Sequence, residues 1–255
     1  MKKISLIDLK GGLGNQIFQI AYALHLKNSG HKTFIDLSFF DQDNLFPRNL
    51  EINPKDFDLK TIKFKNNRLF FLLNTWFEED SSFSVNDFKF LNRFVGYYQN
   101  LKYLEESKDK FRSVLGIEGD KTFQETVLIH IRRTDYLKIS QELDLGFYTN
   151  ALNVFNPDIQ IDIFTDEINF PYDKVFIKKN VRNIFLNNNK TSPSETLRKM
   201  CMYKNFIIAN SSYSLIAAYL SLSNEKKVVY PEPWFKNSNI YINNIPKSWI
   251  PEKNI

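Results

Sequence analysis

The sequence has little of what disulfide and metal sites require. Its single cysteine among 255 residues, Cys201, excludes a disulfide within the chain and a cysteine-based zinc site. The three histidines, His25, His31 and His130, are nowhere spaced as His-Glu-x-x-His. We therefore expect no resident metal and no metal-dependent reaction.

Long apolar segments are also missing. The amino-terminal stretch MKKISLIDLKGG carries two lysines but too short an apolar run for a signal peptide. No segment approaches the roughly 20 consecutive apolar residues of a membrane-spanning helix. We expect a cytoplasmic protein without a membrane span.

A strong excess of one charge is absent as well. The net charge is +5, but residues 1–122 hold 18 Lys and Arg against 16 Asp and Glu, and residues 123–255 hold 16 against 13. Neither half forms a basic platform, which argues against nucleic-acid binding and leaves room for a phosphate-bearing ligand or an anionic membrane. The apolar fraction of 43%, with 24 Phe and 12 Tyr, supplies a large core that takes up most of the aromatic rings.

The amino-terminal residues predict a βαβ unit. Residues 3–9 read as a strand, and a glycine turn at 11–14 leads into an apolar helix that ends before Gly30. A second strand follows at 32–37. Parallel strands with a covering helix predict an α/β domain that begins at residue 1.

The segment between residues 40 and 120 has a weaker pattern. Two stretches rich in aromatic and charged residues, 64–77 and 88–106, fit helices. The polar segment 115–121 contains two glycines, so we place a domain boundary there, with one domain over 1–121 and the other over 122–255.

The second half repeats the alternation of strands and helices. Strands are predicted at 127–131, 159–164, 174–177, 205–209 and 226–230, and helices at 146–155, 194–204 and 213–222. The sequence therefore predicts two Rossmann-like α/β domains, which we expect to face each other across a cleft.

Polar segments follow the predicted strands. They are Gly11–Gln16, His130–Tyr136, Thr165–Glu167 and Asn210–Ser214. Ligands of open parallel sheets bind at the carboxyl ends of the strands, so these segments hold the candidate site residues.

The segment His130–Tyr136 combines two fixed cations with a titratable ring. The guanidinium groups of Arg132 and Arg133 match phosphate oxygens and can stabilise the charge on a leaving diphosphate without a metal ion. A structural alternative stays open: an Arg–Asp135 pair bracing the domain, with His130 as a core histidine.

The segment Asn210–Ser214 precedes a predicted helix. Its hydroxyls and the free amides of the first helical turn form an anion site. Simple N-capping by Ser211 or Ser212 is the alternative, and it is compatible with phosphate binding.

The glycine turn invites a dinucleotide-binding interpretation, with Asp36 near the end of the next strand. The third glycine of that pattern is replaced by Ile17, and no P-loop Lys-Ser/Thr is present. Alternatively, the glycines allow close approach of a substrate while the amides of Asn15 and Gln16 face it.

Asp166 and Glu167 follow another predicted strand. Their carboxylates could accept hydrogen bonds from a ribose or base, and the alternative is an ordinary solvated turn.

Taken in order, these motifs resemble the α-1,2-fucosyltransferases of bacteria and animals, glycosyltransferase family 11, and we identify the chain as a bacterial member. The matching segments are GGLGNQIFQIAYA, HIRRTDY, FTDE, FIIANSSYS and, more weakly, KVVYPEPWF, which span roughly residues 11–236.

The resemblance implies a GT-B-type fold with an acceptor-side domain over 1–121 and a donor-binding domain over 122–255. It implies an inverting transfer of L-fucose from GDP-β-L-fucose to the 2-hydroxyl of a galactoside, without metal or cofactor. The acceptor would be a galactoside-terminated, lipid-linked precursor of a bacterial surface glycan, which would bring the enzyme to the inner face of the membrane.

The resemblance also suggests roles for individual residues. Arg132 would neutralise the diphosphate, with His130, Arg133 and Asp135 as donor-site or supporting residues. Other donor contacts would come from Asp166, Glu167, Glu195 (beside Thr196, where the family has an acidic residue), Asn210, Ser211, Ser212 and Ser214. Gly12, Gly14, Asn15 and Gln16 would lie near fucose or the acceptor, and Asp135 and Glu142 are the candidate catalytic bases.

Three other interpretations stay open from the sequence. A transferase using a different GDP-sugar fits the same motifs. A Rossmann-type NAD(P)-dependent oxidoreductase explains residues 3–36 but not the later segments. A non-catalytic carbohydrate-binding protein explains the aromatic residues but not two phosphate-type sites.

Overall fold

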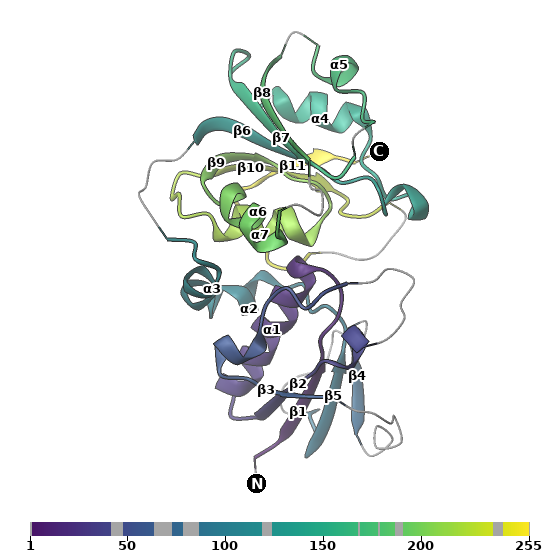
Figure 1. The fold of residues 1–255 in the computed structure, drawn as a ribbon, viewed down its shortest axis with the longest axis vertical. Coiled ribbons are helices and arrows are strands. Elements are labelled where there is room, and N and C mark those ends of the chain that lie inside the picture. Colours follow the sequence, from purple (N-terminus) through teal and green to yellow (C-terminus); the bar gives the residue numbers. More distant parts are fainter. Residues whose placement is uncertain are drawn as a thin grey trace. The chain divides into compact units, whose positions relative to one another are not determined.

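The computed structural model describes residues 2–41, 48–63, 73–78, 87–118, 124–167, 169–177, 179–186, 191–236 and 242–254. The chain divides into two units, Met1–Val114 and Leu115–Ile255 (Figure 1). The sequence predicts the boundary after Lys121, whereas the structure divides the chain after Val114.

The first unit contains a five-stranded sheet in the order β3-β2-β1-β5-β4, with parallel pairing throughout. Its strands are β1 (Ile4–Asp8), β2 (Lys32–Asp36), β3 (Lys60–Ile62), β4 (Asn74–Phe77) and β5 (Leu91–Val95). The helices are α1 (Leu13–Asn28), α2 (Leu101–Glu105) and α3 (Lys108–Leu115), with 3₁₀ turns η1 (Ser38–Asp41) and η2 (Pro54–Phe57).

Helix α1 confirms the predicted βαβ unit. Ile17, Phe18 and Ile20 are fully buried, because the helix packs against β1 and β2 on one side and α2 on the other. The helix ends at Asn28 with Ser29 as its C-cap, and Gly30 with φ of +92° turns the chain back toward β2.

The helices predicted at 64–77 and 88–106 are wrong where the structure describes those residues. Residues 74–77 form β4 and residues 91–95 form β5, and only 101–105 are helical; residues 64–72 lie outside the described part of the chain. The burial of β5 alternates with a period of two, which is the pattern of a strand. Its buried Asn92 accepts hydrogen bonds from Trp76 Nε1 and Lys89 N, so a polar residue occupies a core position.

The second unit contains a six-stranded parallel sheet in the order β11-β10-β9-β6-β7-β8. Its strands are β6 (Gln124–Ile131), β7 (Gln160–Thr165), β8 (Asn180–Leu186), β9 (Tyr203–Ile207), β10 (Lys227–Glu232) and β11 (Ile250–Lys253). Its helices are α4 (Leu145–Leu152), α5 (Tyr172–Val175), α6 (Pro193–Met200) and α7 (Ser212–Leu220), with a 3₁₀ turn η5 (Leu137–Ile139). The predicted pair of α/β units with parallel sheets is therefore confirmed.

Helices cover both faces of this second sheet, with α4 and α5 on one side and α6 and α7 on the other (Figure 1). Ile129 and Ile131 of β6 pack with Phe147 and Tyr148 of α4 in one buried cluster. Because side chains alternate along a strand, His130 lies on the opposite face, toward Tyr213 at the start of α7, with ring centroids 6.1 Å apart.

Further differences from the sequence prediction occur in the second unit. The strand predicted at 174–177 is wrong, since Tyr172–Val175 form α5. The strands β8 and β11 were not predicted, because β8 is exposed at nearly every position and β11 has little apolar character. The helix predicted to run to residue 204 ends at Met200.

A buried carboxylate connects three strands of this sheet. Asp162 on β7 is fully buried and accepts hydrogen bonds from Tyr203 Oη at 2.6 Å, Asn183 Nδ2 at 2.9 Å and the Arg182 guanidinium. Burial alone would raise the pKa of Asp162, but the bonds from Arg182, Tyr203 and Asn183 outweigh burial and lower it. This network fixes edge strand β8 against β7 across the register shift between Ile161 and Asp162.

The described residues contain neither a membrane-spanning helix nor a cluster of metal ligands. None of the helices in those ranges has the length and apolar character needed to cross a bilayer. Within the same ranges, no three His, Cys, Asp or Glu side chains are grouped as metal ligands.

Candidate functional site

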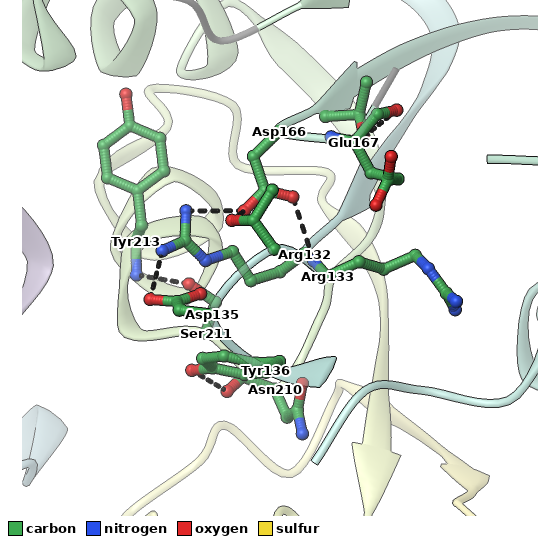
Figure 2. A network of polar contacts seen from close by, with 11 residues as sticks. Arg132, Arg133, Asp135, Tyr136, Asp166, Glu167, Asn210, Ser211 and Tyr213 are labelled. Carbon is green, nitrogen blue, oxygen red and sulfur yellow. Dashed lines mark hydrogen bonds and ion pairs between the residues drawn. The ribbon is translucent and has the colours of Figure 1, made fainter. Parts of the chain in front are cut away.

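The strand order of the second unit places two of the predicted segments beside each other. Strand β6 has β7 on one side and β9 on the other, so the chain connections diverge at the carboxyl end of β6. This is the position at which open parallel sheets bind ligands. The loop after β6 contains Arg132–Tyr136, and the loop after β9 contains Asn210 and Ser211 (Figure 2).

Arg132 is held between two carboxylates. Its Nη2 lies 2.6 Å from Asp135 Oδ2 and its Nη1 lies 2.9 Å from Asp166 Oδ2 (Figure 2). Only 20% of the side chain is exposed, and the guanidinium lies 5.8 Å from the centroid of the Tyr136 ring. Burial opposes the charge of Arg132, but the two carboxylates outweigh burial and raise its pKa above the usual value.

Asp166 organises the loop that carries Arg132. Besides its ion pair, the carboxylate accepts hydrogen bonds from Arg133 N at 2.9 Å and Thr134 Oγ1 at 2.7 Å. Its side chain is 8% exposed. The sequence leaves a ribose or base contact and a solvated turn open for Asp166; its carboxylate contacts the β6 loop of its own unit, and a ligand contact stays a prediction.

Arg133 extends in the opposite direction from Arg132 (Figure 2). Its guanidinium lies 5.5 Å from the centroid of the Phe170 ring. Among the described residues, no carboxylate lies within ion-pair distance of Arg133. The two adjacent cations therefore differ: Arg132 is fixed by two carboxylates, and Arg133 has no carboxylate partner within the part of the chain that the structure describes.

His130 is buried directly before this loop, with 6% of its surface exposed. Burial lowers the pKa of His130 to about 4; the Asp166 charge acts in the opposite direction and the Arg132 charge in the same direction. Its Nδ1 is enclosed and has no hydrogen-bond partner among the described residues. His130 is therefore a neutral ring behind Arg132 near neutral pH.

Tyr136 and Asn210 join the two loops. The Tyr136 hydroxyl donates to the carbonyl oxygen of Asn210 at 3.0 Å, and Asn210 Nδ2 donates to the carbonyl oxygen of Gln141 at 2.7 Å. Burial is the largest influence on the pKa of Tyr136 and raises it to about 12. Tyr136 lies within the HIRRTDY motif, but its sequence position alone indicates no individual role for it.

The serines at the start of α7 differ in their hydrogen bonds and in their burial. Ser211 is the N-cap and its side chain accepts a hydrogen bond from Tyr213 N. Ser214 is fully buried and its hydroxyl donates within the turn, to the carbonyl oxygens of Ala209 and Ser211. Ser212 is half-buried.

The three predicted glutamates have different surroundings. Glu142 follows Gln141, the residue bonded to Asn210, and its Oε2 is enclosed without a partner among the described residues. Glu167 Oε1 accepts from Asn169 N, which closes a turn after β7. Glu195 is 47% exposed, and its Oε1 lies 3.5 Å from Lys199 Nζ one turn further along α6.

In the first unit, the predicted glycine turn precedes α1 at the carboxyl end of β1. Gly11 has φ of +81°, and a Cβ there would lie 2.9 Å from Asn15 Nδ2 and 3.3 Å from Tyr97 Cε1. At Gly12 a Cβ would meet no atom of the described residues within 4 Å, so the turn faces open space there. Gly14 is buried inside the first turn of the helix.

The two amide side chains of this turn differ in what they offer a ligand. Gln16 is fully buried: its Nε2 donates to the carbonyl oxygens of Gly11 and Asn49 at 2.8 Å, and its Oε1 accepts from Glu51 N. Gln16 therefore braces the turn, and its predicted ligand contact stays a prediction. Asn15 is half-buried, and its Oδ1 accepts from Gln99 Nε2 at 2.8 Å.

Comparison with known proteins assigns the family. Residues 2–250 match the model named Glycosyl transferase family 11. The chain belongs to glycosyl transferase family 11. Membership confirms the resemblance drawn from the motifs and removes the ground for the oxidoreductase interpretation of residues 3–36.

Two relatives of this family 11 glycosyltransferase come from Escherichia coli. The O-antigen biosynthesis glycosyltransferase WbnK is 26% identical, over 91% of this chain and 95% of that protein. An α-1,2-colitosyltransferase is 26% identical, over 95% of this chain and 96% of that protein.

Solved structures with a detectable likeness are more distant. The E. coli heptosyltransferase WaaC aligns with a TM-score of 0.43 and 11% identity, over 97% of this chain and 92% of that one. The fucosyltransferase NodZ from Bradyrhizobium aligns with a TM-score of 0.41 and 10% identity, over 85% of this chain and 92% of that one.

Substitutions at the two neighbouring glycines should distinguish a role in folding from a role in ligand binding. Gly11→Ala should lower the free energy of unfolding by about 1–2 kcal/mol, because an alanine is strained at positive φ. Gly12→Ala should cost less than about 1 kcal/mol, the loss of a preferred N-cap residue. On the prediction that the acceptor lies at this turn, the added methyl group should take up part of the ligand's space and raise the KM of the acceptor. Urea unfolding and steady-state kinetics measure both effects; equal stability losses, or wild-type kinetics in the Gly12 variant, would contradict this assignment.

The buried His130 makes stability depend on pH. Because its folded pKa of about 4 lies below the ordinary value of 6.5, its contribution is fully present above pH 6.5 and is lost as pH falls toward 4. The full loss is about 3 kcal/mol, at 1.36 kcal/mol per pKa unit. In urea unfolding at about pH 7 and about pH 4.5, His130→Gln should show a smaller drop in stability than the wild type. An unchanged drop would mean that His130 does not titrate in this way.

Proposed function

We propose that this glycosyltransferase transfers L-fucose from GDP-β-L-fucose to the 2-hydroxyl of a galactoside, with inversion at the anomeric carbon, in the synthesis of a bacterial surface glycan. Family membership supports the glycosyl transfer. The names of the two relatives, one for O-antigen biosynthesis and one for α-1,2 transfer, support the pathway and the linkage.

The observation that carries the proposal is the fixed position of Arg132 at the carboxyl end of β6. Two carboxylates use two of its five N–H groups, which leaves three for phosphate oxygens. Arg132, Asp135 and Asp166 together carry a net negative charge, because one guanidinium lies between two carboxylates. This group of three therefore does not attract a diphosphate by itself. Arg133 and the first amides of α7 supply the additional positive potential.

When the bond between the sugar and the diphosphate breaks, negative charge develops on the diphosphate. The acceptor hydroxyl attacks C1 of fucose from the face opposite GDP, the bond from C1 to the diphosphate oxygen breaks, and its electron pair stays on that oxygen. Arg132 is held in place before the reaction and stabilises this charge without reorganising, which lowers the barrier. The neutral His130 ring behind it keeps this side of the site free of a second buried cation.

The acceptor proton requires a base. Of the two predicted candidates, Asp135 has its carboxylate on Arg132 and serves as a positioning residue. Glu142 is the better candidate, because its enclosed oxygen has no partner among the described residues and it adjoins the residue bonded to Asn210. We assign the proton to Glu142 as part of this proposal.

A donor related to fucose is a second candidate, favoured by the colitosyltransferase relative. Colitose is L-fucose without its 3-hydroxyl group, so both sugars present the same reacting carbon and differ at one hydroxyl.

A lipid-linked acceptor would bring the protein to the inner face of the membrane as a peripheral enzyme.

The test of the proposed function is a transfer assay with purified protein in EDTA. GDP-fucose, GDP-colitose and GDP-mannose are each offered with lactose, and the linkage of any product is read by NMR. We expect an α-1,2-fucosylated product from GDP-fucose. Transfer from GDP-colitose alone would replace fucose by colitose as donor, and absence of transfer from every GDP-sugar to lactose and to a panel of galactosides would overturn the proposal.

Arg132 should be sensitive to a change that keeps its charge. Arg132→Lys removes the planar fork, so kcat should fall by roughly 100-fold or more. Arg133→Lys is the matched comparison: that residue has no carboxylate partner in the described structure, and we expect a loss of less than about tenfold. Circular dichroism and thermal unfolding confirm that both variants fold. Equal losses in the two variants would show that the carboxylate-held position of Arg132 is not what matters.

A further inference from the structure

The loop that follows β5 in the first unit is held by one carboxylate. Glu78 Oε2 accepts a hydrogen bond from Tyr97 N at 2.6 Å, and its Oε1 accepts one from Gln99 N at 3.0 Å. Glu78 follows β4, which pairs with β5, so the end of one strand fixes the loop after its neighbour. This loop lies beside the carboxyl end of β1, where the strand order of the first sheet diverges toward β2 and β5.

Tyr98 anchors this loop to the core. Its backbone has a φ of 52°, a region that non-glycine residues seldom occupy. Its ring stacks on Tyr22 with centroids 4.1 Å apart, and its hydroxyl donates to the carbonyl oxygen of Trp76. With Tyr98 turned inward, the neighbouring Tyr97 points outward and is 37% exposed.

The outward ring of Tyr97 stands beside the glycine turn. A Cβ at Gly11 would lie 3.3 Å from Tyr97 Cε1, and Lys10 Nζ lies 5.4 Å from the ring centroid. Next to it, Gln99 Nε2 donates to Asn15 Oδ1. An exposed aromatic ring, an ammonium group and a pair of amides are thus fixed together beside the open space at Gly12.

We propose that Tyr97 is a stacking platform for a pyranose ring of the acceptor, with Lys10, Asn15 and Gln99 as hydrogen-bonding groups for its hydroxyls. A galactoside has a face of C–H groups that packs on an aromatic ring and an edge of hydroxyls that needs polar partners. This inference rests on the proposed function, because it takes the acceptor to be a galactoside. It places the acceptor, and not the donor, in the first unit.

Two features favour a binding role for Tyr97 over a purely structural one. A ring needed only to cover the glycine turn gains its stabilisation from burial, yet more than a third of Tyr97 stays exposed. The buried Tyr98 already anchors the loop, so Glu78 fixes the direction of a side chain that the fold itself does not require.

The test uses Tyr97→Ala, Tyr97→Phe and the control Phe90→Ala. Phe90 is 43% exposed and directly precedes β5, so it lies at the opposite end of that strand. In transfer assays, Tyr97→Ala should raise the KM for lactose about tenfold, corresponding to about 1.4 kcal/mol of lost binding, and leave kcat and the KM for the GDP-sugar within about twofold. Tyr97→Phe keeps the ring face and should retain most acceptor affinity, and Phe90→Ala should behave as the wild type.

A second measurement is independent of catalysis. Saturation-transfer NMR with methyl β-D-galactopyranoside should show contact with the wild type, Tyr97→Phe and Phe90→Ala, and loss of the signal in Tyr97→Ala. GDP binding, measured by calorimetry on the same samples, should be unchanged in all three variants. If no GDP-sugar is transferred but the galactoside signal depends on Tyr97, the proposed reaction fails and the platform stands. An unchanged galactoside signal in folded Tyr97→Ala, or no galactoside binding to the wild type, overturns the platform.

Discussion

The candidate donor site depends on one arrangement of charges: Arg132 between Asp135 and Asp166. A partly buried guanidinium without partners would be costly, and two carboxylates remove that cost while fixing the planar group in one orientation. The same arrangement determines its surroundings. Asp166 also holds the backbone of the β6 loop, and His130 behind the guanidinium stays neutral. The site therefore has its geometry before any ligand arrives, which is the condition for electrostatic catalysis.

The two units use the same device to shape a loop at a sheet edge. In the second unit, Asp166 follows β7 and accepts hydrogen bonds from the loop after the neighbouring strand β6. In the first unit, Glu78 follows β4 and accepts hydrogen bonds from the loop after the neighbouring strand β5. In both cases a carboxylate at one strand end satisfies amides that a loop would otherwise leave to water. The outcome differs, because one loop presents a cation and the other an exposed tyrosine ring.

Much of this organisation could be predicted from the sequence where local pattern and position agree. The apolar helix after the glycine turn, the strand ending at Ile131 and the motifs after it were placed correctly, since a strand end limits where its next residues lie. Residues 88–106 suggest a helix because they are rich in aromatic and charged residues. The partners that let the polar Asn92 occupy the core of β5 come from β4 and from Lys89. Whether a polar side chain faces a ligand or its own chain also depends on residues distant in sequence. Gln16, which bonds to Asn49 and Glu51, and Asp166, which bonds to the β6 loop, are both examples.

The hydrogen bond from Tyr136 to Asn210 joins loops that are 74 residues apart in sequence. Because the Tyr136 ring also lies against Arg132, a displacement of either loop changes the position of the cation. The two loops are thus structurally coupled, and the effects of substitutions in them are expected to be non-additive. A chimera that takes one loop from another family member and keeps the other loop would combine parts fitted to different partners, even if every residue that contacts the donor were retained.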